Sequence, residues 1–304
     1  MAHDRNGEAC LKKNNYLNSS LFMLVGCLGF ASPALAQSNV PDHGFYIGAG
    51  GTVSNVDFGK QDVYAVGTSD TFNPAGVLVA TGSAWGPATL SMDDEFTFSP
   101  SVQGGYFQKF ANSEWLWGAK FNYNYLGTTS ALKNALLPQA GAFTYTGDPT
   151  PVPFTGNAVV RSYETTITHQ MALIPYVGHA FENSYLYAGA GPTLSRTRTD
   201  LNGLVGFADI NGNRQDISGA PQNFSESQWV YGGAATIGGT YFLSPKWFLD
   251  FSYTYAKTES KTNNYASTFV NPGSDGTVTQ GTLVGTSKAD VTTQGLTLTA
   301  NWLF

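Results

Sequence analysis

Apolar and small polar side chains alternate without a break over residues 295–304, at the end of the chain. An extended strand has a period of two, so this pattern predicts a strand with one apolar face and one polar face. The apolar face carries Leu296, Leu298, Ala300, Trp302 and Phe304. A free apolar strand edge invites pairing with other chains, and a closed barrel removes that edge. The pattern therefore favours a last strand that pairs with the first, over residues 44–53.

Stretches with the same alternation recur along the chain. The predicted strands are 42–55, 96–110, 115–126, 163–181, 185–198, 229–243, 247–258 and 295–304. Three tight polar turns alternate with four long polar segments. The first segment ends at Asp94, and the other three cover 127–160, 200–227 and 259–288. We predict an all-β protein, an eight-stranded up-and-down antiparallel transmembrane β-barrel with short periplasmic turns and four long extracellular loops.

The aromatic residues distinguish this barrel from a soluble β-sandwich, which also uses alternating strands. Trp115, Trp117 and Trp247 lie beside the short turns, whereas Tyr125 and Trp229 lie near the long segments. Two aromatic belts are typical of the two interfaces of a membrane. A sandwich core gives no reason for tryptophan at both ends of the strands.

Composition agrees with this fold class. Charged residues make up only 12% of the chain, and mean hydropathy is near neutral, which argues against helical spans. The net charge of −6 and the absence of a basic run exclude nucleic acid as a partner.

The start of the chain is typical of a secretory signal. Lys12 and Lys13 precede an apolar run at 21–30, and Ala34-Leu35-Ala36 is a small-x-small cleavage pattern. We predict a signal peptide over 1–36, cleavage between Ala36 and Gln37, and a barrel over 37–304.

Two alternatives remain open for this leader: a single membrane anchor, and lipidation of Cys27 in the lipobox-like Leu24-Val25-Gly26-Cys27. The start codon is also open, because the leader is long. Cys10 and Cys27 are the two cysteines, so cleavage would leave no disulfide or thiol chemistry.

The chain resembles the small bacterial outer-membrane β-barrel family, which includes the opacity adhesins and the OmpA-type transmembrane barrel. The matching segments are residues 44–50 (GFYIGAG), 187–191 (YAGAG) and 302–304 (WLF). The resemblance implies a Gram-negative outer-membrane location and contact with its lipids and lipopolysaccharide. It also implies that Trp302 and Phe304 form the signal for the barrel-assembly machinery.

The lumen contains the most distinctive charges. By alternation, Lys120 and Asp250 face inward, and a lone buried charge is costly. We expect them to join an interior polar network that fills the lumen. The pairing would fail if the two groups lay on opposite sides of the barrel or at different heights.

Catalytic chemistry is not indicated. An enzyme on this scaffold, such as one that modifies lipid or peptide, needs a nucleophile and a base within hydrogen-bond reach. After cleavage the histidines are His43, His169 and His179, and alternation turns His169 outward. We predict no enzyme activity, no cofactor and no metal site, and we interpret residues 93–95 (DDE) as a solvated acidic turn rather than a cation site.

The long segments remain as carriers of function. They are rich in Thr, Ser, Asn and Gly, with scattered aromatic residues, which suits contacts with host proteins or glycans. We predict a surface-exposed structural or adhesin-like role. The alternatives are a narrow pore for small solutes, favoured by inward glycines, and the surface enzyme considered above.

Overall fold

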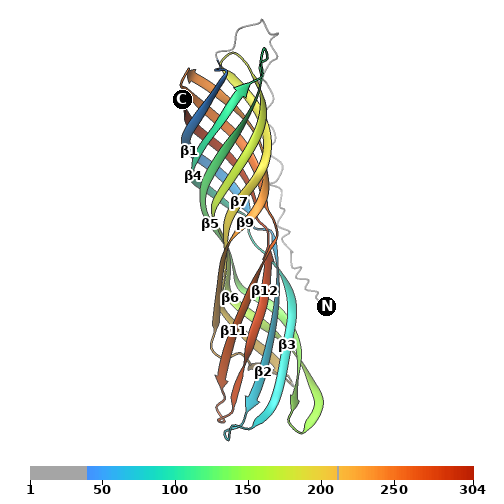
Figure 1. Ribbon diagram of the computed structural model, residues 1–304. Helices are drawn as coiled ribbons and strands as arrows, with labels where there is room; N and C mark the ends of the chain where they lie inside the picture. Colours follow the sequence, from blue (N-terminus) through green and yellow to red (C-terminus); the bar gives the residue numbers. More distant parts are fainter. Residues whose placement is uncertain (1–39, 211) are drawn as a thin grey trace, which may run out of the picture. The chain divides into compact units, whose positions relative to one another are not determined.

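The computed structural model describes residues 40–210 and 212–304, which form one antiparallel sheet of 13 strands (Figure 1). The predicted signal peptide, with Ala36, Gln37 and Cys27, lies outside the described residues. The strands are β1 (His43–Asp57), β2 (Lys60–Phe72), β3 (Leu78–Ser91), β4 (Glu95–Lys109), β5 (Trp115–Tyr145), β6 (Asp148–Ala180), β7 (Ser184–Ile210), β8 (Asn213–Asp216), β9 (Gln222–Ser244), β10 (Trp247–Thr258), β11 (Lys261–Pro272), β12 (Val278–Ala289) and β13 (Thr292–Leu303).

Eight strands close into a ring in the order β1, β4, β5, β6, β7, β9, β10 and β13. The last strand pairs with the first from Tyr46↔Leu303 to Asp57↔Thr292. This ladder confirms the predicted closure, and the all-β antiparallel prediction is also confirmed. We call these eight paired strands the ring.

The four long segments are not loops, and this part of the prediction was wrong. Two of them contain the hairpins β2–β3 and β11–β12, which pair with each other through β12 and β2. The segment between β5 and β6 continues both strands to a turn at residues 146–147. The segment between β7 and β9 extends β7, contains β8 and includes the first part of β9. The described part of the chain therefore forms 13 strands instead of the expected eight.

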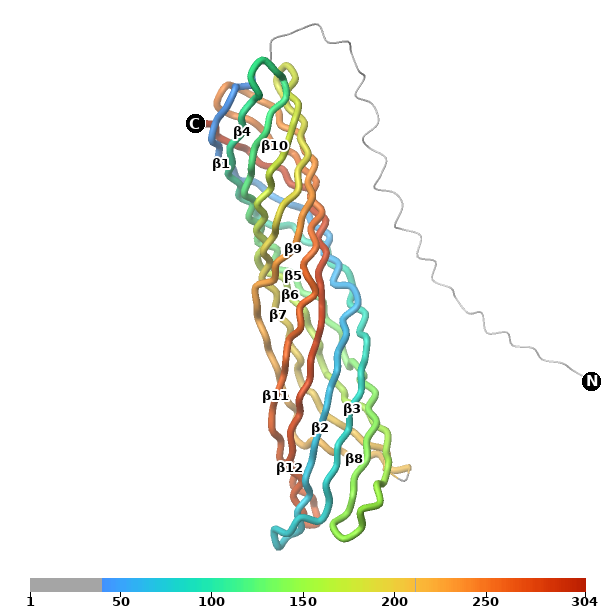
Figure 2. The backbone as a smooth tube through the Cα atoms, turned by 45° about the vertical axis from the view of Figure 1, so that its right-hand side comes forward, coloured from blue at the N-terminus to red at the C-terminus, as the bar shows by residue number. Residues whose placement is uncertain are grey.

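These added strands and the distal parts of β5, β6, β7 and β9 form a second region, which we call the extension. Figures 1 and 2 show the tips of β2, β3, β11 and β12 at the opposite end of the sheet from the C-terminus. At the start of the extension, β5 is interrupted by a register shift between Tyr125 and Thr128, where Gly127 has a φ of +56°. A left-handed residue of this kind suits glycine and permits the local bulge.

Burial alternates along both regions, but several ring strands expose their apolar face and bury a polar one. In β13 the ring buries Thr297, Thr299 and Asn301 and exposes Leu296 and Leu298. In the extension the apolar residues turn inward and pack in one cluster. That cluster includes Val56, Phe58, Val63, Leu90, Leu137, Val160, Tyr163, Ile167, Leu201, Leu204 and Tyr265.

The polarity change explains the failed loop prediction. Hydroxyl pairs cross the outer face of the extension strands, as between Thr68 and Thr282 at 2.7 Å and between Thr129 and Thr166 at 2.7 Å. These threonines make the sequence look like a polar loop, although β-branched residues suit a strand. Within the described residues, no helix is long and apolar enough to cross a membrane.

Candidate functional site

The predicted lumen charges lie inside the ring and meet across it. Lys120 Nζ is 3.8 Å from Asp250 Oδ2, and both side chains are only 2% exposed. Tyr187 joins them, because its hydroxyl accepts a 2.6 Å bond from Lys120 Nζ and donates to Asp250 at 2.9 Å. A further contact of 3.4 Å runs from Lys120 Nζ to the Ser252 hydroxyl.

The two charged groups pair although they come from opposite sides of the barrel, where we expected the pairing to fail. Lys120 lies on β5 and Asp250 on β10, which are on opposite sides of the eight-strand ring. An eight-stranded barrel is narrow enough for side chains to fill it, so a long lysine reaches across. Opposite strands therefore do not prevent the contact.

An aromatic cluster fills the ring below these charges, toward the short turns. It contains Tyr46, Phe107, Leu116, Tyr176, Tyr185, Tyr187, Phe242, Phe248 and Leu303, all buried. Ring centroids lie 5.2 Å apart between Tyr46 and Phe248 and 5.0 Å apart between Phe242 and Phe248. Such contacts are in the range of favourable aromatic packing.

Buried polar side chains also fill the ring. Gln103 Nε2 donates to Asn301 Oδ1 at 2.8 Å, and Gln170 Nε2 donates to the Thr293 hydroxyl at 2.9 Å. Aromatic, charged and polar side chains thus occupy the interior of the ring, and apolar side chains occupy the start of the extension.

Beyond the apolar cluster, the extension encloses a cavity of about 560 Å³. Leu137, Ala158, Leu201, Leu204 and Tyr265 belong both to the cluster and to the cavity lining, so the cluster forms the floor of the cavity. This volume is within the range of small-molecule sites. A second, more open cavity of about 740 Å³ shares Ser69, Ser83 and Phe269 with the first, and its lining includes several threonine and serine residues.

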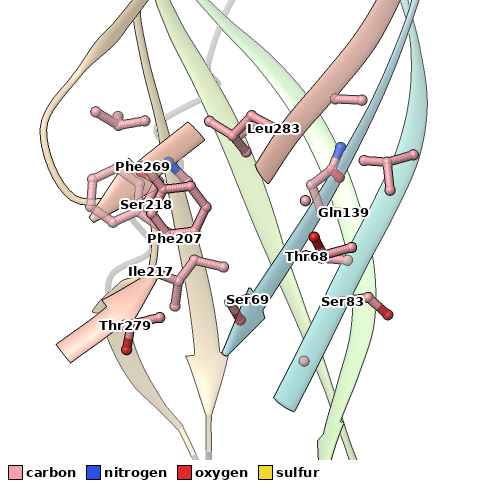
Figure 3. A pocket seen from close by; sticks show the side chains of 18 of the residues that line it. Thr68, Ser69, Ser83, Gln139, Phe207, Ile217, Ser218, Phe269, Thr279 and Leu283 are labelled. Atoms are coloured by element: carbon pink, nitrogen blue, oxygen red, sulfur yellow. Dashed lines mark hydrogen bonds between the residues drawn. The ribbon is translucent and has the colours of Figure 1, made fainter. Parts of the chain in front are cut away.

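The cavity wall is mostly apolar and uncharged. Figure 3 shows Phe207, Ile217 and Phe269 on one side, with Gln139 and Ser83 across from them. Burial raises the pKa of the Tyr265 hydroxyl, so this group stays neutral at physiological pH. The sequence indicated the aromatic residues of this wall only as scattered loop aromatics suited to contacts and did not predict the cavity; the alternation of Val63, Ala65 and Gly67 within a supposed loop was the available signal.

A seam runs along one side of the extension between β9 and β11. In the described residues β11 forms its backbone ladder with β12, and β9 forms its ladders with β7 and β10. Side chains bridge the seam instead. The bridges are Gln228 with Asn263, Ser267 with Gln222 at 2.9 Å, and the rings of Phe224 and Tyr265 at 5.6 Å. Asn271 of β11 also contacts the Asp216 carbonyl of β8 at 3.3 Å.

A row of apolar residues, most of them exposed, crosses the outer face of four neighbouring strands in the extension. Val284 on β12 pairs with Val66 on β2, which pairs with Trp85 on β3, which pairs with Ala140 on β5. Trp85 is 49% exposed and Val284 is 45% exposed. We call these four residues the outer row.

The remaining sequence candidates lie apart from the cavity. His169 Nδ1 is 2.8 Å from the Tyr123 hydroxyl, and its ring contacts those of Tyr125 and Trp229 on the outside of the ring, as alternation predicted. His179 lies against Trp115. Among the described residues, no group of three or more His, Cys, Asp and Glu side chains is placed to hold a metal ion.

The predicted assembly residues lie at the end of β13. Trp302 packs against Trp247 with ring centroids 4.9 Å apart. Phe304 is 76% exposed, and its backbone N–H donates to the Phe45 carbonyl at 2.9 Å. Trp302 thus belongs to a tryptophan pair, whereas the Phe304 side chain is free for another contact.

Comparison with known proteins gives one match along most of the chain. The model of the family described as outer membrane protein beta-barrel domain matches residues 22–304. A search of curated proteins found no match.

Similar solved structures include three small outer-membrane proteins. Ail of Yersinia pestis, solved with the heparin analogue sucrose octasulfate, has 11% identity over 81% of this chain and 99% of its own, with a TM-score of 0.31. OprG of Pseudomonas aeruginosa has 12% identity over 88% and 99%, with a TM-score of 0.38. The protease OmpT of Escherichia coli has 8% identity over 84% and 97%, with a TM-score of 0.26.

Proposed function

The chain belongs to the outer membrane protein β-barrel domain family, and on that premise we propose that it is a non-conducting surface protein whose extension binds partner proteins. Its location is the bacterial outer membrane. We place the short turns in the periplasm and the extension outside the cell, because outer-membrane barrels have that asymmetry.

The outer row is the observation that carries this proposal. Trp85 and Val284 expose apolar side chains, and Val66 lies half-buried between them, on a strand surface that the proposed orientation places in water, beyond the lipid. Aromatic residues at the centre of a contact patch are frequent binding hot spots. The paired strands beneath the row fix the positions of these side chains, so little order has to be gained on binding.

Attachment assays test this role. Cells that display the protein should bind immobilised host-cell or matrix proteins, and Trp85→Ser or Val284→Ser should weaken attachment by about tenfold, as expected for loss of a hot spot. Val270→Ser is the matched control for Val284→Ser, since Val270 is 59% exposed on β11 but lies outside the row. Equal attachment by all variants would refute the binding role. Loss of attachment only after removal of surface glycans would assign the partner to glycans instead.

The filled lumen argues against the alternative of a pore. The Lys120–Tyr187–Asp250 network and the buried aromatic cluster occupy the path of a solute through the ring. We propose that they serve as a structural plug. Purified protein in planar bilayers should give no steady single-channel current; such a current would favour the pore.

Enzyme activity also receives no support from the site geometry. The hydrogen-bond partner of His169 is a tyrosine hydroxyl, and its other neighbours are aromatic rings and Arg196 of the adjacent strand. We propose that the protein is not an enzyme. Hydrolysis of lipid A or a peptide that His169→Ala abolishes would contradict this.

Lipopolysaccharide is the lipid partner we propose at the boundary between ring and extension. The Arg196 guanidinium lies 6.0 Å from the Trp229 ring, beside His169 on the outer face. A cation beside an aromatic belt suits a phosphorylated lipid head group. Arg196→Gln should reduce the lipopolysaccharide that copurifies with the protein, whereas Arg214→Gln, on β8, should not.

Two assembly steps complete the proposal. Cleavage between Ala36 and Gln37 would be seen in the mass of the mature N-terminus, and a lipidated Cys27 would contradict it. Deletion of Phe304 should lower the amount of folded protein in the outer membrane, because its exposed ring is available to the barrel-assembly machinery. Normal assembly without Phe304 would remove that assignment.

A further inference from the structure

The cavity in the extension has the composition of a small-molecule site. It holds about 560 Å³, and its wall combines aliphatic and aromatic side chains with amides and hydroxyls. The proposed binding of proteins uses the outward side chains of the outer row, of which Val66 and Val284 also contribute to the cavity wall. The interior of the cavity is not needed for that role.

Charge restricts what the cavity can accept. Asp216 is the one charged residue among the described residues that line it. Its carboxylate already accepts the backbone N–H groups of Ser218 at 3.0 Å and Gly219 at 3.1 Å. No lysine, arginine or histidine of the described lining could neutralise an anion, and burial of an unpaired charge is costly.

The cavity has a floor as well as an entrance. Leu137, Leu201 and Leu204 close it toward the ring, where the apolar cluster and the side chains that fill the ring follow. At the other end it meets the open cavity through shared residues that include Ser69 and Ser83. A molecule that enters would therefore be held rather than passed through.

From these observations we propose that the extension is a dead-end binding site for an uncharged, largely apolar small molecule. Phe207, Phe224 and Phe269 provide aromatic surfaces for it, and Gln139 and Ser218 provide polar groups on the wall. The lining strands alternate, so the same segments present the outer row to partners and the cavity wall to the ligand.

Two fluorescent probes that differ by one sulfonate group test the charge requirement. The full-length protein in lipid nanodiscs is titrated with neutral N-phenyl-1-naphthylamine and with anionic 8-anilino-1-naphthalenesulfonate, and empty nanodiscs are subtracted. We expect saturable binding of one neutral probe per protein and at least about tenfold weaker binding of the anion, a difference of about 1.4 kcal/mol. Equal binding of both probes, or no saturable signal from the neutral probe, would overturn the proposal.

A matched pair of variants locates the site. Ala65→Phe places a ring into the cavity from β2, whereas Ala266→Phe places the same ring on the outer face of β11. Ala65→Phe should weaken the binding of the neutral probe by at least about tenfold, and Ala266→Phe should leave the affinity for this probe unchanged. Ser69→Phe is the second blocking variant if Ala65→Phe does not fold, as judged by heat-dependent gel mobility. Unchanged affinity in a folded blocking variant would overturn the assignment.

Discussion

The ring and the extension share the continuous strands β5, β6, β7 and β9, yet their outer faces differ in polarity. Around the ring, apolar side chains point outward and Thr297, Thr299 and Asn301 point inward. In the extension, Val63, Leu137 and other apolar residues point inward, while threonine pairs lie outside. A strand offers two faces at every position, so the surrounding medium decides which face must be apolar.

The two regions also differ in how they close and how they fill. The ring closes through backbone ladders on every strand, and layers of side chains occupy its interior. The extension closes through side chains at the β9–β11 seam and keeps a cavity. The filled ring is suited to anchoring the protein in the membrane, and the extension with its cavity is suited to binding.

The largest expected effect concerns the filled ring. Lys120→Met leaves Asp250 buried without its cation and should lower the free energy of unfolding by about 3–5 kcal/mol in denaturant titrations. Lys257→Met is the control: it removes a 2.9 Å pair with Asp290 whose lysine is exposed, and we expect little change. The double variant Lys120→Met/Asp250→Leu should recover most of the loss. Equal stability of the single variant and the wild type would show that the pair is not coupled.

Two glycine substitutions compare how tightly the ring and the extension are packed, one in the filled ring and one in the cavity wall. A Cβ at Gly118 would overlap the Tyr176 ring and lie 2.6 Å from the Tyr106 carbonyl oxygen, so Gly118→Ala should cost about 1–3 kcal/mol of unfolding free energy. At Gly206, in the cavity wall, the nearest atom would be 3.5 Å away, and Gly206→Ala should be close to neutral. Similar losses in both variants would mean that the extension is packed as tightly as the ring.

The seam predicts a local effect. Asn263 is buried and bonds to Gln228, to Thr199 at 3.2 Å and to Ser287 at 3.4 Å. Asn263→Ala should destabilise β11 by about 1–3 kcal/mol and speed its amide hydrogen exchange, because partners lose their hydrogen bonds. Exchange in β13 should not change, and Asn264→Ala, at an exposed neighbour, serves as control. Faster exchange in both strands would show that the two regions unfold together.

The smallest effect lies at the boundary between the regions. Burial and repulsion from Asp57 raise the pKa of the Asp94 carboxyl. A raised pKa means that the ionised form is disfavoured in the folded protein, so this cost is present at neutral pH and disappears as pH falls through the raised pKa. Asp94→Asn should slightly raise the thermal midpoint at neutral pH and leave it unchanged at acidic pH. The same rise in the thermal midpoint at neutral and at acidic pH would exclude the electrostatic cause.

The period-two pattern determined much of the fold by itself. It gave the ring strands, their outward faces and the pairing of residues 44–53 with the last strand, because lipid and lumen impose opposite demands on alternate residues. It also placed Lys120 and Asp250 on inward faces. The short, polar turns made the hairpin order visible.

Only the tertiary structure decided what the polar segments do. Their inward residues, such as Val63, Ala65 and Tyr265, are separated by threonine, serine and glycine, so each segment alone has too little apolar surface to identify it as a strand. They become strands because neighbours from distant parts of the chain supply the backbone partners and bury the apolar side chains together. The cavity, the seam and the outer row arise from that assembly, since each is formed by residues that no local pattern brings together.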